Sequence, residues 1–197
     1  MKRLAVTTFF IFLTLTLTAG EKSMEKPDIK LNPHPKMRYE IMLTIRDAPG
    51  PFESVTAFAY YETNSECVPE QAISGARLNV RTDIPVDLKP AGENSYRGTV
   101  YMDLLKDEDY YGLGVCRWKL ISFNAPMKAG EVTFGPAIMG DEISSEKLKT
   151  QFFPKSYFGD SSVIKDTHTG GLPMSEPVAR APGKFFSTTL IAEENFE

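Results

Sequence analysis

The sequence is poor in the residues from which most metal and catalytic sites are built. Its 197 residues include only two histidines, two cysteines and one tryptophan. Zinc sites and catalytic triads depend on histidine or on clustered cysteine ligands. His34 lies between two prolines and is expected to be solvated, which leaves His168 as the one histidine in the body of the domain. These shortages argue against a metalloenzyme and against a hydrolase of the triad type.

Motifs that present a nucleophile are also missing. The chain has no G-x-S-x-G sequence, the turn that exposes the serine of an α/β-hydrolase. The pattern S-x-x-K begins at Ser23, Ser144 and Ser162, but without the S-D-N or K-T-G companions found in β-lactamases. A hydrolase with His168 as general base beside Asp166 stays open as an alternative. The prediction is a protein without enzymatic activity, cofactor or metal.

Basic clusters are absent as well. The chain has 22 basic and 26 acidic residues, a formal charge of −4. Nucleic acids and anionic lipid surfaces are bound by clustered Lys and Arg. Neither is therefore expected as a partner.

The N-terminus has the three parts of a secretory signal peptide. Lys2 and Arg3 precede an apolar run over residues 4–17, and Thr18-Ala19-Gly20 follows as a cleavage site. The run falls short of the ~20 residues that span a bilayer, and threonines interrupt it, so a transmembrane anchor is the less favoured alternative. We predict that residues 1–20 are removed on export to the periplasm, leaving 20 basic residues against 26 acidic ones. No cysteine follows the run, so no membrane anchor is expected after cleavage.

The two cysteines are expected to form a disulfide. An even number of cysteines in an exported chain favours a covalent bridge. Cys67 and Cys116 are 49 residues apart, and closing a loop of that length stabilises a domain by ~4 kcal/mol in the chain-entropy model. A metal pair or a redox site would call for neighbouring histidine or C-x-x-C spacing, which neither cysteine has.

Alternating apolar residues predict an all-β fold. Tyr39, Ile41, Leu43 and Ile45 alternate with polar residues between positions 37 and 46, as in a half-buried strand. Further strands are predicted at 54–62, 76–82 with a continuation to 88, 95–104, 115–123, 131–134 and 184–192. Spacing of about ten residues between strands, with Gly, Pro and Asn turns, is typical of an antiparallel β-sandwich.

One domain of immunoglobulin-like architecture is predicted over residues 37–197, after a flexible leader at 21–36. The immunoglobulin signature itself is missing, because Trp118 follows the second cysteine instead of lying between the two. The C-terminal part at 141–183 reads as rich in loops, with one short helix at 141–151.

The stretch 107–118 holds the densest acidic run, two adjacent tyrosines, one cysteine and the only tryptophan. We predict a loop between two paired strands. A plain solubilising turn is one interpretation, and calcium binding through carboxylates is another, although the spacing of an EF-hand is absent. The third is a recognition loop, in which aromatics supply contact area and acids select a basic partner. Its partner-binding residues would be Asp107, Glu108, Asp109, Tyr110 and Tyr111.

A second aromatic group lies at Phe152–Phe158 without a consistent period. It either plugs one end of the sandwich or forms an exposed patch. In the second case Phe153, Tyr157 and Phe158 would also contact a partner. Stacking of the strand tyrosines on sugars is a further alternative, although tyrosines in strands are more often packing residues.

Two segments carry a resemblance to a known group of proteins. Cys67-Val68-Pro69, followed downstream by Asp109-Tyr110-Tyr111-Gly112-Leu113-Gly114-Val115-Cys116-Arg117-Trp118, resembles a pattern in small exported proteins of Gram-negative bacteria. Some of these are immunity proteins that neutralise type VI secretion lipase effectors in the periplasm. The lipid-attachment cysteine of many relatives is absent here. The resemblance implies a periplasmic protein that binds and occludes a secreted toxin.

The expected function is therefore a periplasmic protein-binding module that acts as an immunity protein. The alternative is an envelope structural or ligand-binding sandwich that recognises glycan or calcium.

Overall fold

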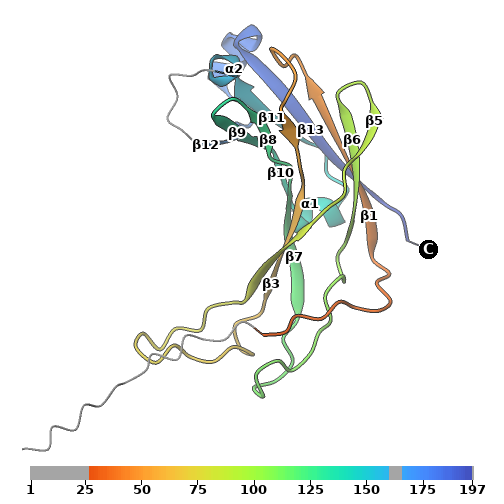
Figure 1. The fold of residues 1–197 in the computed structure, drawn as a ribbon, viewed down its shortest axis with the longest axis vertical. Coiled ribbons are helices and arrows are strands. Elements are labelled where there is room, and N and C mark those ends of the chain that lie inside the picture. The colour runs from red at the N-terminus through yellow and green to blue at the C-terminus, as the bar shows by residue number, and fades with distance from the viewer. Residues whose placement is uncertain (1–26, 160–165, 197) are drawn as a thin grey trace, which may run out of the picture.

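The chain folds into two packed layers of β-strands (Figure 1). The computed structural model describes residues 27–159 and 166–196. One layer is an antiparallel sheet with the order β11-β13-β1-β6-β5. Its strands are β1 (Arg38–Arg46), β5 (Lys89–Gly92), β6 (Ser95–Tyr101), β11 (Lys149–Pro154) and β13 (Phe185–Glu194).

The second layer consists of two four-stranded sheets, β10-β7-β3-β4 and β12-β9-β8-β2. Pro126 separates β7 from β8 and Pro136 separates β9 from β10, where proline lacks the N–H that a ladder needs. Among the described strands, β12 and β9 are the one pair that runs parallel. The strands are β2 (Ser54–Val55), β3 (Phe58–Thr63), β4 (Arg81–Pro85), β7 (Trp118–Asn124), β8 (Met127–Ala129), β9 (Val132–Gly135), β10 (Ala137–Met139) and β12 (Thr167–Gly170). The predicted β-sandwich is thereby confirmed.

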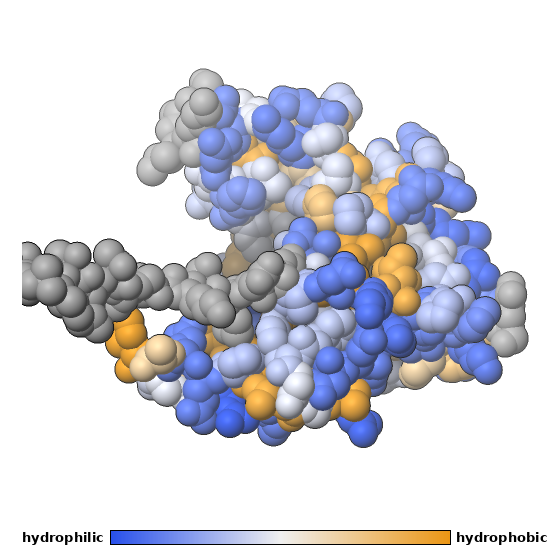
Figure 2. Space-filling view, turned by 60° about the horizontal axis from the view of Figure 1, so that its bottom comes forward, coloured by the Kyte–Doolittle hydropathy of each residue, from blue (hydrophilic) through white to orange (hydrophobic). Residues whose placement is uncertain are grey.

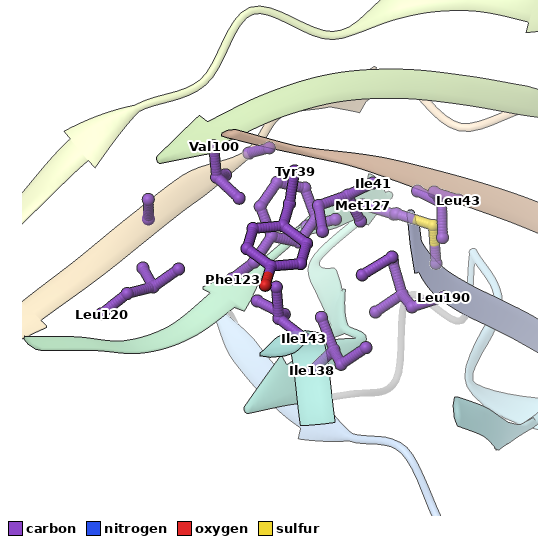
Figure 3. Packing of buried hydrophobic residues seen from close by; sticks show 14 of the residues in the cluster. Tyr39, Ile41, Leu43, Val100, Leu120, Phe123, Met127, Ile138, Ile143 and Leu190 are labelled. Atoms are coloured by element: carbon purple, nitrogen blue, oxygen red, sulfur yellow. The ribbon is translucent and has the colours of Figure 1, made fainter. Parts of the chain in front are cut away.

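The core lies between the layers (Figure 3). The four apolar residues that alternate in β1 all point inward and are buried, as their period predicts. Across from them, Leu120 and Phe123 of β7 and Ile138 of β10 are fully buried. The period of two thus assigns the face of β1 correctly. In β7 a register shift opposite Tyr60 and Tyr61 interrupts the period and places both Leu120 and Phe123 in the core.

Five phenylalanines close the end of the sandwich near the β8–β9 turn, and we call this cluster the phenylalanine plug. Phe134, Phe153 and Phe186 are buried, and Phe52 and Phe158 pack against them half-buried. The ring centroid of Phe186 lies 5.0 Å from that of Phe134 and 5.2 Å from that of Phe153. Both distances are within the range of favourable aromatic pairs. Of the two roles considered for the segment 152–158, the plug is therefore correct for Phe153 and Phe158.

Two strands that were expected to pair do not. β6 pairs with β1 and β5 in one layer, whereas β7 pairs with β3 and β10 in the other. Residues 102–117 consequently cross from one layer to the other instead of closing a hairpin. Alternation fixes which face of a strand is buried, but it does not choose the neighbouring strand.

The C-terminal third is more regular than predicted. Helix α1 (Gly140–Ser144) stops where the predicted helix 141–151 would continue, because Lys149–Pro154 pairs with β13 as strand β11. The loop-rich region also contains β12, α2 (Glu176–Arg180) and two 3-10 turns, η1 (Lys155–Tyr157) and η2 (Pro182–Lys184). Pairing with a neighbouring strand here outweighs local helix propensity.

Part of the predicted flexible leader is docked on the domain. Leu31 forms a bridge with Leu105, and the Asn32 amide donates to the Leu104 carbonyl at 2.8 Å. Residues 1–26, including the predicted signal peptide, lie outside the described residues. Within the described part of the chain, no helix has the length and apolar character needed to cross a membrane.

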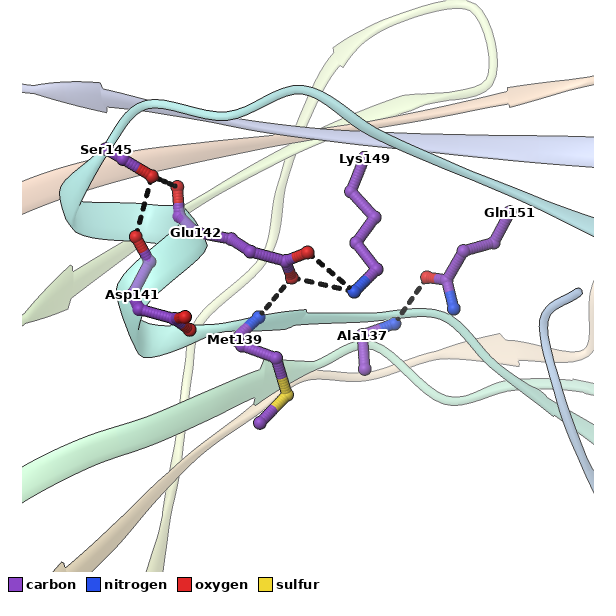
Figure 4. Close-up of polar contacts among 7 residues, drawn as sticks. All are labelled: Ala137, Met139, Asp141, Glu142, Ser145, Lys149 and Gln151. Atoms are coloured by element: carbon purple, nitrogen blue, oxygen red, sulfur yellow. Dashed lines mark hydrogen bonds and ion pairs between the residues drawn. The ribbon is translucent and has the colours of Figure 1, made fainter. Parts of the chain in front are cut away.

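Helix α1 and β11 cap the free edge of β10 (Figure 4). Glu142 Oε2 accepts from the Met139 amide at 2.9 Å, and Gln151 Oε1 accepts from the Ala137 amide at 2.8 Å. The Lys149 ammonium lies 2.7 Å from Glu142 Oε2. Burial opposes ionisation of Glu142, but Lys149 and the Met139 amide outweigh it and hold its pKa below 4.5.

We expect Glu142→Ala to lower the free energy of unfolding by about 1–3 kcal/mol, because it leaves the Met139 amide and Lys149 without their acceptor. Glu142→Gln keeps an acceptor but loses the charge. Since the folded-state pKa is lowered, the wild-type contribution is complete above pH 4.5 and is lost as the pH falls through the folded pKa. Urea titrations from neutral to acidic pH should therefore bring wild type and Glu142→Gln together. A gap that stays constant with pH would contradict this role.

Candidate functional site

The β3–β4 and β6–β7 connections lie at the end of the sandwich away from β8, β9 and α2 (Figure 1). A disulfide joins these two loops. Cys67 and Cys116 are bonded, with their Cα atoms 5.1 Å apart, which confirms the predicted bridge. Both are buried together with Val68 in a small core of their own. We call residues 64–80 and 106–117, the two loops that this bridge connects, the disulfide end.

The acidic residues of the disulfide end help to build its loop. Asp107 Oδ1 accepts from the Trp118 amide at 2.9 Å, and Asp109 Oδ1 accepts from the Leu113 amide at 3.0 Å. Glu108 forms an ion pair with Lys30 at 3.0 Å, whose hydrogen bond lowers the pKa of Glu108. Within the described residues, Asp107 and Asp109 have no ion pair and are exposed, so their charges face solvent.

The two tyrosines are half-buried. The Tyr110 hydroxyl donates to the Lys106 carbonyl at 2.7 Å, and its ring packs edge-on against Trp118 with 6.3 Å between centroids. Tyr111 packs against the disulfide core, and burial raises the pKa of its hydroxyl. Both residues therefore support the loop and offer only part of their rings to a partner.

The geometry does not support the calcium interpretation. Each carboxylate of the run 107–109 serves a different partner, and the three do not converge on one point. Among residues 27–159 and 166–196, no group of three or more His, Cys, Asp or Glu side chains is placed to hold a metal ion.

Exposed apolar side chains at the disulfide end were missed by the sequence reasoning. Ile73 is 87% exposed and Leu78 is 53% exposed in one loop, while Leu113 and Val115 are about half exposed in the other. The loop around Ile73 is shaped by backbone bonds from Gln71 to Ala76 at 2.9 Å and from Gly75 to Gln71 at 2.8 Å. Figure 2 turns this end forward and shows separate hydrophobic patches among hydrophilic surface. The sequence signal that could have predicted these exposed residues is an isolated apolar residue among turn-forming Gly, Ser and Asn.

The second predicted contact region lies at the other end of the molecule (Figure 1). Phe153 is fully buried, so its expected role in partner binding is wrong. Phe158 is half-buried within the plug, with its ring 5.1 Å from Phe52, and so serves packing. Only Tyr157 is exposed. The predicted contact residues thus belong to two separate regions, with exposed Asp107 and Asp109 at the disulfide end and exposed Tyr157 at the other end.

The remaining hydrolase candidate lies on a surface strand. His168 is exposed in β12. Asp166 directly precedes that strand and has a left-handed backbone, with a φ of 59°. In the described part of the chain, no hydrogen bond or ion pair links His168 to Asp166. The pair therefore lacks the base–orienter contact that a catalytic histidine needs.

Comparisons with protein-family models, with curated proteins and with solved structures find no match for this chain.

Proposed function

We propose that the protein is an exported, non-enzymatic module that binds a protein partner through the disulfide end. The observation that carries this is the exposure of Ile73, Leu78, Leu113 and Val115 on two loops that a buried disulfide connects. A few anchor residues that become fully desolvated in a partner's pockets provide most of the energy of an interface. Loops held in place before binding lose less entropy when a partner docks.

The charge of the disulfide end supports a partner with a basic surface. Asp107 and Asp109 are exposed beside Leu113 in sequence. Carboxylates around an apolar contact favour a positively charged partner and repel an acidic one. A disulfide also fits an oxidising compartment such as the periplasm.

A secreted toxin is the partner class that we propose. The two segments that resemble immunity proteins, Cys67–Pro69 and Asp109–Trp118, both lie at the disulfide end or at its border. Insertion of loop 106–117 across the cleft of a toxin would exclude its substrate. In this mechanism the chain blocks a reaction and carries out none.

The test is complex formation with the toxin encoded next to this protein's gene. We expect the wild-type protein to co-elute with it in size-exclusion chromatography and Ile73→Asp/Leu113→Asp to lose at least tenfold in affinity, because two apolar anchors become charged. Leu148→Asp is the matched control, since Leu148 is 56% exposed on the connection after α1. It should bind as the wild type does.

Two outcomes would contradict the proposal. One is equal binding by both variants, and the other is the absence of any complex. A saturable heat on titration with calcium or muropeptides would favour the glycan- or calcium-binding alternative instead.

A further inference from the structure

The sheet β10-β7-β3-β4 of the second layer has two edges, and the described residues cap only the β10 edge. On the β10 side, side chains of Glu142 and Gln151 accept from the outward amides of Met139 and Ala137 (Figure 4). An uncapped edge offers unpaired N–H and C=O groups to another strand. The other edge strand of this sheet is β4, where a further strand can be added.

The alternation of hydrogen bonds between β3 and β4 shows which N–H and C=O groups of β4 face outward. The Thr63 amide donates to the Val80 carbonyl at 3.0 Å, and β3 pairs with β4 residue for residue from there without a bulge. In an antiparallel pair, alternate residues exchange hydrogen bonds with one neighbour. Val80 and Thr82 therefore bond toward β3, while Arg81 and Asp83 direct their N–H and C=O groups away from it. Within the described residues, nothing pairs with these outward groups.

The side chains on this edge are complementary to themselves. Arg81 and Asp83 are both exposed on the same face of β4. If a second β4 runs antiparallel with Thr82 opposite Thr82, each Arg81 lies opposite the Asp83 of the other copy. These are the outward-facing residues, so each pair exchanges two backbone hydrogen bonds and also joins opposite charges.

Other registers are less favourable. Moving the centre by one residue sets Arg81 against Arg81 or Asp83 against Asp83, and like charges directly opposite each other destabilise a sheet. Pro85 has no N–H and ends the ladder on its side. Arg81 binds Glu62 through Nε at 2.6 Å, which leaves its terminal nitrogens for a second carboxylate. Asp83 has no ion pair among the described residues.

We propose that a second copy of this chain docks on the open edge of β4, in antiparallel register about Thr82, to form a two-fold symmetric dimer with one continuous sheet. This interface is closed, because each copy supplies the same strand to the other. It uses residues other than the proposed anchors Ile73 and Leu113 of the disulfide end, so either proposal can fail without the other.

Sedimentation velocity of the purified protein over a range of concentrations tests the dimer. We expect a concentration-dependent dimer for the wild type and at least a tenfold weaker dimer for Asp83→Arg, which sets two arginines opposite each other. Arg81→Asp should be weakened likewise, because it opposes two aspartates. Mixing the two variants should restore a dimer of one copy each, since every cross-strand pair is then Arg with Asp.

Two further variants distinguish an effect on the β4 edge from a general effect of net charge on dimer formation. Glu131→Arg makes the same charge change at another exposed residue and should dimerise as the wild type does. Asp83→Pro removes an outward amide without touching the bonds to β3 and should remain monomeric. Circular dichroism establishes that each variant is folded.

A wild type that stays monomeric at every concentration would overturn the proposal and would mark Arg81, Asp83 and Pro85 as residues that keep the edge unpaired. A dimer that all the variants form equally would place the interface elsewhere and would overturn it too. Failure of the mixture to restore the dimer while each variant stays folded would refute the register.

Discussion

The double variant Cys67→Ala/Cys116→Ala is expected to lower the free energy of unfolding by about 4 kcal/mol, because the bridge closes a loop whose ends are 49 residues apart. That is a large fraction of the roughly 5–15 kcal/mol that stabilises a typical domain. Urea denaturation followed by tryptophan fluorescence is suited to the measurement, since Trp118 lies next to the bridge in sequence. The loops of the disulfide end should also lose their fixed positions.

The control for this prediction uses the same chemistry without mutation. Wild-type protein treated with a reductant in the denatured state, and refolded in its presence, should match the double variant. The double variant itself should not respond to reductant. Equal stability of the oxidised wild type and the double variant would show that the bridge does not hold the loops together.

The second large effect is expected for Phe134→Ala in the phenylalanine plug. Phe134 is fully buried and its ring contacts those of Phe52, Phe153, Phe158 and Phe186. Removing a buried aromatic ring costs about 3–5 kcal/mol, through lost burial and the cavity that remains. Thermal and urea unfolding should both show the loss.

Tyr157→Ala is the matched control for the plug. Tyr157 is an exposed aromatic residue at the same end, and its removal should change stability by no more than about 0.5 kcal/mol. Partner binding at the disulfide end should be unchanged in any Phe134→Ala protein that remains folded. A loss below 1 kcal/mol for Phe134→Ala would contradict the central place of this residue in the plug.

Local pattern was sufficient for some elements and insufficient for others. β1 was predictable because every second residue is apolar, and the bridge because only two cysteines exist. The neighbouring strands of β6 and β7 were not predictable, since strand pairing depends on contacts between residues distant in sequence. Strand β11 was missed because Lys149 and its neighbours favour a helix locally, whereas pairing with β13 decides their conformation.

The candidate site was found only in part. The acidic residues and tyrosines at 107–111 drew attention by composition, but several of them shape the loop through Trp118, Leu113 and Lys106. The exposed apolar side chains of Ile73 and Leu113 were not predicted, because no period marks a residue in a turn as exposed. Phe153 was misplaced because an aromatic run does not itself show which ring faces the core.

The most direct test places a photo-reactive amino acid at one position at a time in the protein, expressed in its native cells. Under our proposal, light joins the protein to one discrete protein partner from Ile73 and from Leu113, and neither adduct forms in the Cys67→Ala/Cys116→Ala background. Leu148 and Tyr157 serve as exposed positions elsewhere, from which that adduct should not form. The account is contradicted if neither loop position yields an adduct, or if the control positions yield the same one.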